Sequence, residues 1–195
     1  MNATSKEAVG LAYSLEGMLH AKRMTWEAIG QIARQVKPGM QESAAREMGL
    51  QVLREMGMER IWHPLLIRFG ANTLKTFKQR SDGDPLLQEN DLFFIDLGVV
   101  WDRHEGDCGA TFVVGDDAEM HACAAAAKSL FDQVHDHWQS HLVAGPELYR
   151  YAQEQARAMG WALNLDIKGH RVSDFPHAIY PVSYTHLRAH ETPEH

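Results

Sequence analysis

The feature that most constrains the fold is a unit of two helices and a strand that occurs twice along the chain. In the first unit, residues 15–36 and 42–56 carry the apolar spacing of helices, separated by a Pro-Gly break at residues 37–39. Gly57 ends the second helix, as glycine commonly does at a helix C-terminus. Residues 61–67 then have the character of a strand.

The second unit repeats this order later in the chain. Residues 118–142 and 147–159 have helical patterns separated by a Gly-Pro break, and Gly160 ends the second pattern. Apolar residues alternate with others over residues 161–167, as in a half-buried strand. A Met-Gly pair marks the equivalent point of each unit. The repetition predicts an internal duplication with pseudo-two-fold symmetry.

Between the two units, a short segment predicts a β-hairpin that carries two aspartates. Residues 92–95 and 111–114 are apolar runs of the aromatic and β-branched kind that is typical of strands. A tight turn at residues 101–102 would place Asp96 directly opposite Asp107, with the two side chains about 5 Å apart on one face. Carboxylates that close resist joint ionisation and favour a divalent cation between them. The alternative is that Asp96 merely ends a strand and Asp107 lies in a loop.

Histidines and a cysteine supply further candidate ligands. His170 follows the second predicted strand, and neutral imidazole is a good ligand for transition metals, although a surface or core histidine is the alternative. His137 and His141 stand four apart on a predicted helix, where we favour a solvated face over a zinc site. Cys108 adjoins Asp107 and is interpreted as a small buried thiol within a strand.

Composition narrows the classes of partner. The chain has 195 residues, of which 26 are acidic and 19 basic, giving a formal net charge of −7. An acidic chain is repelled by phosphate backbones and anionic lipid, so we expect neither nucleic acid nor a membrane as partner. The sequence has no apolar run of bilayer-spanning length and no secretory signal at its start. We therefore expect a cytoplasmic protein in which Cys108 and Cys123 are free thiols.

The chain resembles the superfamily of methionine aminopeptidase, Xaa-Pro aminopeptidase, prolidase and creatinase in the segments VKPGMQE, FFIDLGVVWDRHEGDCGATFVVG and GHRVSDFPH. The resemblance covers nearly the whole chain up to Pro181. It implies an α+β chain with the pita-bread fold, in which helices from two pseudo-symmetric halves flank a curved antiparallel sheet. We expect this fold to be incomplete at the C-terminus.

The resemblance also implies a metal site. Members bind two divalent ions, which we expect to be manganese, cobalt or zinc, through two Asp, one His and two Glu. Asp96 and Asp107 match the aspartates, with Asp107 bridging, and His170 matches the histidine ligand. His177 matches a catalytic histidine that contacts the substrate and helps to stabilise the tetrahedral intermediate. The two Glu ligands are expected beyond Pro181.

The implied function is a metal-dependent aminopeptidase, similar to Xaa-Pro aminopeptidases, in which a hydroxide bridging two metals attacks the N-terminal peptide bond. Peptides would be its substrates, and we allow for a homodimer. Two alternatives stay open. One is a creatinase-like hydrolase that needs no metal, and the other is a pita-bread domain reused as a non-catalytic binding module.

Three departures from the family pattern bear on these alternatives. Many members carry a histidine some way before the first aspartate, but residues 77–79 contain none at that place, and His63 lies further upstream. Gly109 and Ala110 stand where members have polar and basic residues. Arg171 replaces the second glycine of the usual Gly-His-Gly.

The last residues resemble a cloning scar. Residues 182–192 read VSYTHLRAHET, which looks like one reading frame of a transposase adapter used in DNA sequencing libraries, although a natural polar tail is the alternative. We therefore expect a truncated catalytic domain at residues 1–181 and a non-native tail at residues 182–195, and we assign neither Glu191 nor Glu194 as a ligand. Because two implied ligands would then be missing, we expect this chain to be inactive.

Overall fold

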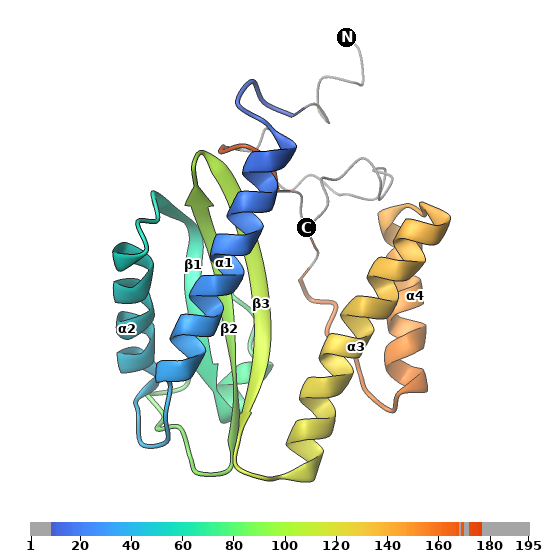
Figure 1. The fold of residues 1–195 in the computed structure, drawn as a ribbon. Helices are drawn as coiled ribbons and strands as arrows, with labels where there is room; N and C mark the ends of the chain where they lie inside the picture. The colour runs from blue at the N-terminus through green and yellow to red at the C-terminus, as the bar shows by residue number, and fades with distance from the viewer. Residues whose placement is uncertain (1–8, 168, 170–171, 177–195) are drawn as a thin grey trace.

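A computed structural model of the protein describes residues 9–167, 169 and 172–176. In chain order, the elements are α1 (Leu15–Gln35), α2 (Glu42–Glu55), β1 (Arg60–Phe69), the 3₁₀-helix η2 (Gly70–Leu74), β2 (Asp91–Trp101), β3 (His104–Val114), α3 (Ala118–His141) and α4 (Gly145–Ala158). The strands form one antiparallel sheet in the order β1-β2-β3. Figure 1 shows this curved sheet with α1 in front of it, α2 on the side of β1 and a helical hairpin on the side of β3.

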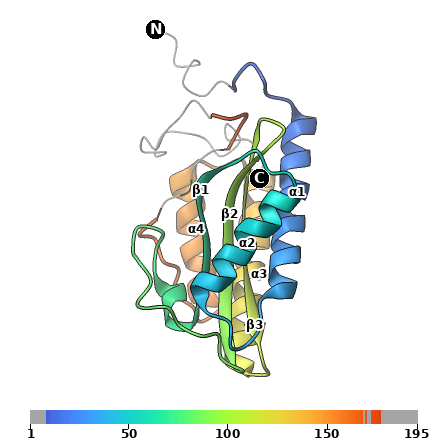
Figure 2. The same cartoon turned by 90° about the vertical axis from the view of Figure 1, so that its left-hand side faces the viewer.

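The core lies between the sheet and a layer formed by α1 and α2. Figure 2 shows both helices on the same side of the three strands. Ile32 of α1, Leu53 of α2 and Ile95 of β2 are all fully buried there. Alternate residues of a strand point to opposite faces. Therefore Asp96 and Gly98, which lie between core residues of β2, face away from the helices.

Both helices of each unit form where their apolar patterns predict them, and the second helices end in the same way. Gly57 and Gly160 have φ angles of +80° and +83°, a region that glycine enters without steric cost. The residue after each glycine donates its N–H to the carbonyl five positions back, at 3.1 Å after α2 and 2.9 Å after α4. These matching turns agree with the predicted internal duplication.

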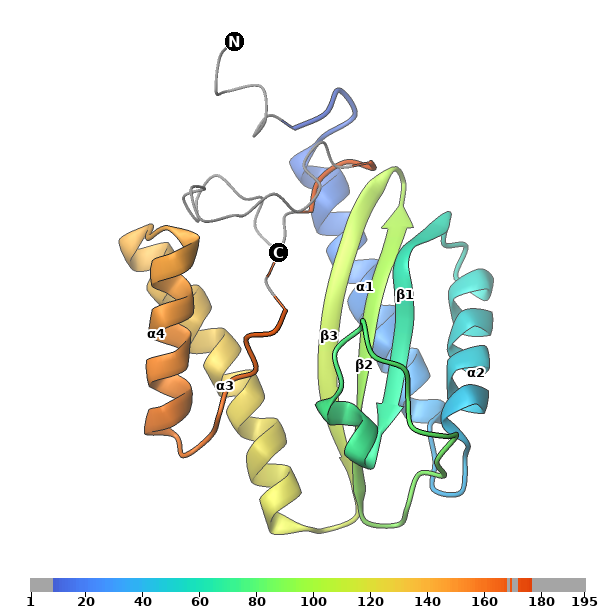
Figure 3. The same cartoon turned by 180° about the vertical axis from the view of Figure 1, so that it is seen from behind.

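The prediction of a strand at residues 161–167 is wrong. This segment follows α4 without any strand pairing in the described part of the chain. Figure 3 shows it running between α4 and the sheet, away from the edges of β1 and β3. A strand needs a neighbour that satisfies its N–H and C=O groups. Alternating apolar residues such as Trp161 and Leu163 do not supply one.

Helices α3 and α4 pack along each other as an antiparallel hairpin (Figure 3). Aromatic rings stack between them, since the ring centroid of His137 lies 3.8 Å from that of Tyr151 and 4.3 Å from that of His141. Among the described residues, neither α3 nor any other helix combines the length and apolar character needed to cross a membrane.

The segment that contains residues 172–176 returns to the turn of the β2–β3 hairpin. Glu105 donates its backbone N–H to the carbonyl of Ser173 at 2.9 Å, and Ser173 N–H donates to Glu105 Oε2 at 3.1 Å. The carboxylate of Asp174 accepts hydrogen bonds from the backbone N–H groups of Gly10 at 2.8 Å and Ala12 at 3.0 Å. These contacts tie the described part of GHRVSDFPH to the hairpin that carries Asp107 and to the segment before α1.

Candidate metal centre

Asp96 and Asp107 lie on adjacent strands, but they do not pair with each other. Asp96 of β2 pairs with Gly109, and Asp107 of β3 pairs with Gly98. The directly opposed arrangement expected from the sequence is therefore wrong. The expectation that both side chains share a face is confirmed, because Asp107 stands opposite Gly98 and Gly98 is two residues from Asp96.

The position of the turn explains the change of register. Asp102 and Arg103 occupy the two central positions, with φ angles of +45° and +64°. Two left-handed residues match the right-handed twist of the flanking strands. Trp101 therefore stays in β2, where it pairs with His104. A turn at residues 101–102 would have required a positive φ at a buried tryptophan, which is sterically unfavourable.

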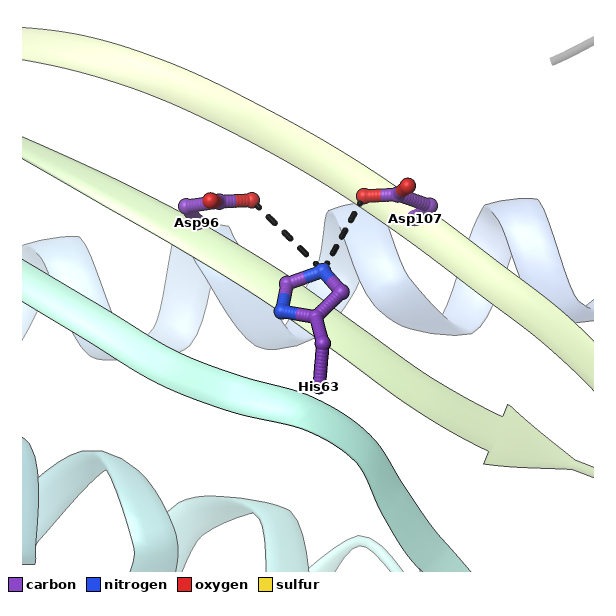
Figure 4. A group of neighbouring side chains, drawn as sticks. All are labelled: His63, Asp96 and Asp107. Atoms are coloured by element: carbon purple, nitrogen blue, oxygen red, sulfur yellow. Dashed lines mark hydrogen bonds and ion pairs between the residues drawn. The ribbon is translucent and has the colours of Figure 1, made fainter. Parts of the chain in front are cut away.

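A histidine from the third strand completes the cluster. The Nε2 atom of His63, on β1, lies 3.3 Å from Asp107 Oδ1 and 3.8 Å from Asp96 Oδ1. Figure 4 shows the imidazole pointing between the two carboxylates on the face of the sheet turned away from the helix behind it. One ligand atom from each residue lies within 4.8 Å of the others, and the described residues hold this single group of three potential metal ligands.

His63 reaches this face because β1 is irregular on both sides of it. From Ile61 to His63 the partner on β2 changes by one position instead of two, and from His63 to Leu66 it changes by two instead of three. Each shift is a β-bulge, which inserts a residue and re-aims the side chains beyond it. Regular alternation would have placed His63 on the core face with Ile61 and Leu65.

The surroundings of His63 fix the direction of its ring. A Cβ atom at Gly98 would lie 1.9 Å from His63 Cδ2, so the imidazole lies where a side chain on β2 would otherwise stand. The Trp62 ring contacts it edge-on at 4.6 Å between centroids and donates Nε1–H to Gly106 O at 3.2 Å. His63 Nδ1 lies 3.1 Å from the carbonyl oxygen of Pro64, which can only accept a hydrogen bond. Nε2 is thereby aimed at the carboxylates.

The two carboxylates control the protonation of this histidine. Burial by itself would lower the pKa of His63, but the hydrogen bond to Asp107 and the negative charge of Asp96 outweigh it. The pKa of His63 is therefore raised above its ordinary value. The cluster thus favours a positive charge between its three side chains, which a proton or a metal cation can supply.

Cys108 does not belong to the cluster, although it is the neighbour of Asp107 in sequence. Its side chain packs on the helix-covered face of the sheet. Burial raises the pKa of the Cys108 thiol to about 12, and the charge of Asp107 acts in the same direction. Because the thiolate is the form that binds metals, the interpretation of Cys108 as a buried strand thiol agrees with its position.

The remaining candidate ligands fall into two groups. His170 and His177 lie outside the described residues, so their predicted roles stay predictions. His137 and His141 stack on each other and on Tyr151 and do not contact the cluster.

Sequence reasoning missed His63, which it set aside as too far upstream. The Gly98 opposite it was the available signal, because a glycine within a strand marks a close approach by another group.

The donor set of the cluster fits a divalent metal. It combines one imidazole nitrogen with oxygens of two carboxylates, and the side chains of Asp96 and Asp107 are 37% and 20% exposed. Carboxylate and imidazole together suit zinc, cobalt and manganese. The partial exposure leaves room for water or a substrate atom beside the carboxylates.

The antiparallel sheet lies between two similar helical units and presents two aspartates on one face. The chain belongs to metallopeptidase family M24, whose family model matches residues 16–192. Its fold is the pita-bread fold of this superfamily. None of the curated protein sequences matches this chain.

Solved structures with the same fold include three kinds of peptidase. An X-Pro aminopeptidase from Thermotoga maritima is 19% identical, with a TM-score of 0.59 over 76% of this chain and 43% of its own. A prolidase from Pyrococcus horikoshii is 17% identical, with a TM-score of 0.67 over 90% of this chain and 51% of its own. A methionine aminopeptidase from Thermotoga maritima is 14% identical, with a TM-score of 0.64 over 88% of this chain and 68% of its own. The chain thus spans about half the length of the first two structures.

Proposed function

We propose that the protein is a metal-dependent aminopeptidase that removes N-terminal residues from peptides, with Xaa-Pro peptides as the preferred substrates. The observation that carries the proposal is the pair Asp96 and Asp107, on adjacent strands and one face, beside the imidazole of His63. Family membership supports peptidase chemistry. The similarity to an X-Pro aminopeptidase and a prolidase is the ground for the substrate preference.

In this proposal Asp96, Asp107 and His170 would hold the divalent metal ions. When bound, the ions supply Lewis-acid activation of water and of the scissile carbonyl. His177 donates a hydrogen bond to the negative charge that develops on the carbonyl oxygen. The half-exposed face of the sheet around Asp96 lets a peptide approach.

We also propose that the protein is cytoplasmic and that residues 182–195 are not native. The first proposal is consistent with two free cysteines in the described structure. The proposal that residues 182–195 are not native affects the activity assay, because the natural coding sequence has to replace these residues before a peptidase assay is informative.

The test is metal-dependent release of N-terminal residues from a panel of Xaa-Pro and other peptides. Activity should require added manganese, cobalt or zinc, disappear with a chelator and be lost in Asp107→Asn. The control Asp116→Asn changes an exposed aspartate before α3 and should leave activity unchanged.

Two results would contradict the proposal. Hydrolysis that survives exhaustive chelation would favour a creatinase-like, metal-independent reaction. Binding of metal and peptides without hydrolysis of any peptide in the panel would favour a non-catalytic binding module.

A further inference from the structure

We infer that His63 is itself a metal ligand, so that three adjacent strands form a His/Asp/Asp site that prefers zinc or cobalt to manganese. The inference deepens the proposed function and rests on its assignment of Asp96 and Asp107 as metal ligands. It adds a nitrogen ligand from β1, outside the segments on which the resemblance to metallopeptidases rests.

The hydrogen bonding of the imidazole is that of a metal-binding histidine. Nδ1 donates to the carbonyl oxygen of Pro64 at 3.1 Å, which leaves the Nε2 lone pair facing the carboxylates in the neutral ring. Histidines that bind metals almost always donate their other N–H to a carbonyl or carboxylate in this way.

The distances fit a shared ion. Two ligand atoms about 2.1 Å from a tetrahedral metal lie roughly 3.4 Å from each other. His63 Nε2 is 3.3 Å from Asp107 Oδ1 and 3.8 Å from Asp96 Oδ1. Asp107 stands at the spacing expected between two ligands of one ion, and the distance to Asp96 is longer than that spacing by about 0.4 Å.

The ring is held in this position before any ion binds. Gly98 leaves the space that the ring fills, and Trp62 packs edge-on against it and is itself hydrogen-bonded to β3. The bulges on both sides of His63, which turn its side chain to this face, are features of the strand backbone and do not depend on an ion. A ligand that is ordered in advance loses little conformational entropy on binding.

The nitrogen ligand determines which metals are favoured. Imidazole suits zinc and cobalt, whereas sites built only from carboxylates and water suit magnesium and manganese. A change of His63 should therefore weaken zinc binding more than manganese binding. A purely structural role for His63 would weaken both equally.

The test measures Zn²⁺ and Mn²⁺ affinity of the 195-residue chain by calorimetry, with circular dichroism as a check on folding. His63→Asn should weaken Zn²⁺ binding at least about tenfold, because even partners that only orient a ligand contribute that much. The change for Mn²⁺ should be clearly smaller, since the Asn side chain offers an oxygen. The visible absorption of bound Co²⁺ should also change. The matched control is His121→Ala, an exposed histidine on α3.

A second variant keeps the histidine but displaces it. In Gly98→Ala the new methyl group would overlap the ring, and the three nearest atoms it meets all belong to His63. Gly98→Ala should weaken Zn²⁺ binding in the wild-type background and have little effect in His63→Asn. This non-additivity is expected only if both changes act through the imidazole.

The outcomes separate this inference from the proposed function. Zn²⁺ binding that is lost in Asp107→Asn but unchanged in His63→Asn would overturn the ligand role of His63 and leave the proposed function standing. Equal weakening of Zn²⁺ and Mn²⁺ in His63→Asn, with an unchanged Co²⁺ spectrum, would also overturn it. Metal affinity that none of these substitutions alters would contradict both.

Discussion

Asp107 of β3 pairs with Gly98 of β2, and His63 of β1 pairs with the same glycine from the other side. Because Gly98 has no side chain, the imidazole of His63 can lie over β2 and reach Asp107. The offset between the two aspartates sets their carboxylates diagonally on one face of the sheet. The glycine between them is therefore as much a part of the site as the aspartates.

The buried contact between α1 and the hairpin should be sensitive to loss of one hydroxyl group. Thr25 is fully buried, and its Oγ1 accepts a hydrogen bond from Trp101 Nε1 at 3.0 Å. Thr25→Val would leave the indole N–H without this acceptor, so the free energy of unfolding should fall by about 1–3 kcal/mol. Urea denaturation measures it. Thr25→Ser keeps the hydroxyl and should cost less; an equal loss in both variants would mean that packing of the methyl group dominates.

Asp174 should make the fold sensitive to acid. Burial would raise the pKa of Asp174, but hydrogen bonds from Gly10 N–H, Ser173 Oγ–H and Ala12 N–H outweigh it, so the pKa is lowered. A carboxyl whose folded pKa lies below its unfolded value stabilises the fold above the unfolded value, and this contribution disappears as pH falls through the folded pKa.

Asp174→Asn should accordingly lower the free energy of unfolding at neutral pH by about 1–3 kcal/mol, since hydrogen bonds to a charged acceptor are lost. The difference from wild type should shrink as pH falls below about 4. Urea unfolding as a function of pH measures both. Asp116→Asn is the exposed control, and a difference for Asp174→Asn that is constant from pH 7 to pH 3 would refute the assignment.

The thiol of Cys108 should react slowly. Burial raises its pKa to about 12, so at pH 8 its thiolate fraction is roughly 10³-fold below that of an ordinary cysteine. In a Cys123→Ser background, alkylation by iodoacetamide should be slow in the folded chain and become fast in urea. Rapid alkylation of the folded protein at pH 8 would show that the thiol is more accessible than its packing on the core face indicates.

Arg68 should control the loop that follows η2. Arg68 is 4% exposed, and its guanidinium donates to the carbonyl oxygens of Lys75 at 2.7 Å and Thr76 at 2.9 Å. The single ammonium of a lysine cannot reproduce this forked geometry. Arg68→Lys should therefore speed trypsin cleavage after Lys75 or Lys78, although the number of cleavage sites stays the same. Arg54→Lys is the exposed control on α2. Equal cleavage in the two variants would contradict a role of the Arg68 hydrogen bonds in holding the loop.

The helices and the hairpin were readable from the sequence because local signals determine them. The patterns at residues 15–36 and 118–142 extend over many turns, and glycines end the second helix of each unit. The strand at residues 161–167 failed because strand formation depends on a partner as well as on alternation. The alternation of apolar residues indicates which side chains would be buried, but it does not indicate whether a partner strand is present.

The candidate site was readable only in part, for two physical reasons. The register of the hairpin depends on which residues accept a positive φ, and Asp102 with Arg103 did so instead of a buried tryptophan. His63 depends on a register that shifts twice within β1, and nothing in the apolar pattern encodes those shifts. Asp96 and Asp107 were found because two carboxylates flanking a turn are informative, and the register differs from the expected one by two residues, which keeps both side chains on one face.

The paired bulges of β1 have a consequence for how this chain can vary. Two inserted residues cancel, so Ile61 and Leu65 keep one orientation and the reversal is confined to the stretch that holds His63. Substitutions at position 63 can thus alter the chemistry of the sheet's open face without disturbing the order of the core. Removing one bulge alone would invert one whole end of the strand, so single-residue deletions here should be far more harmful than substitutions.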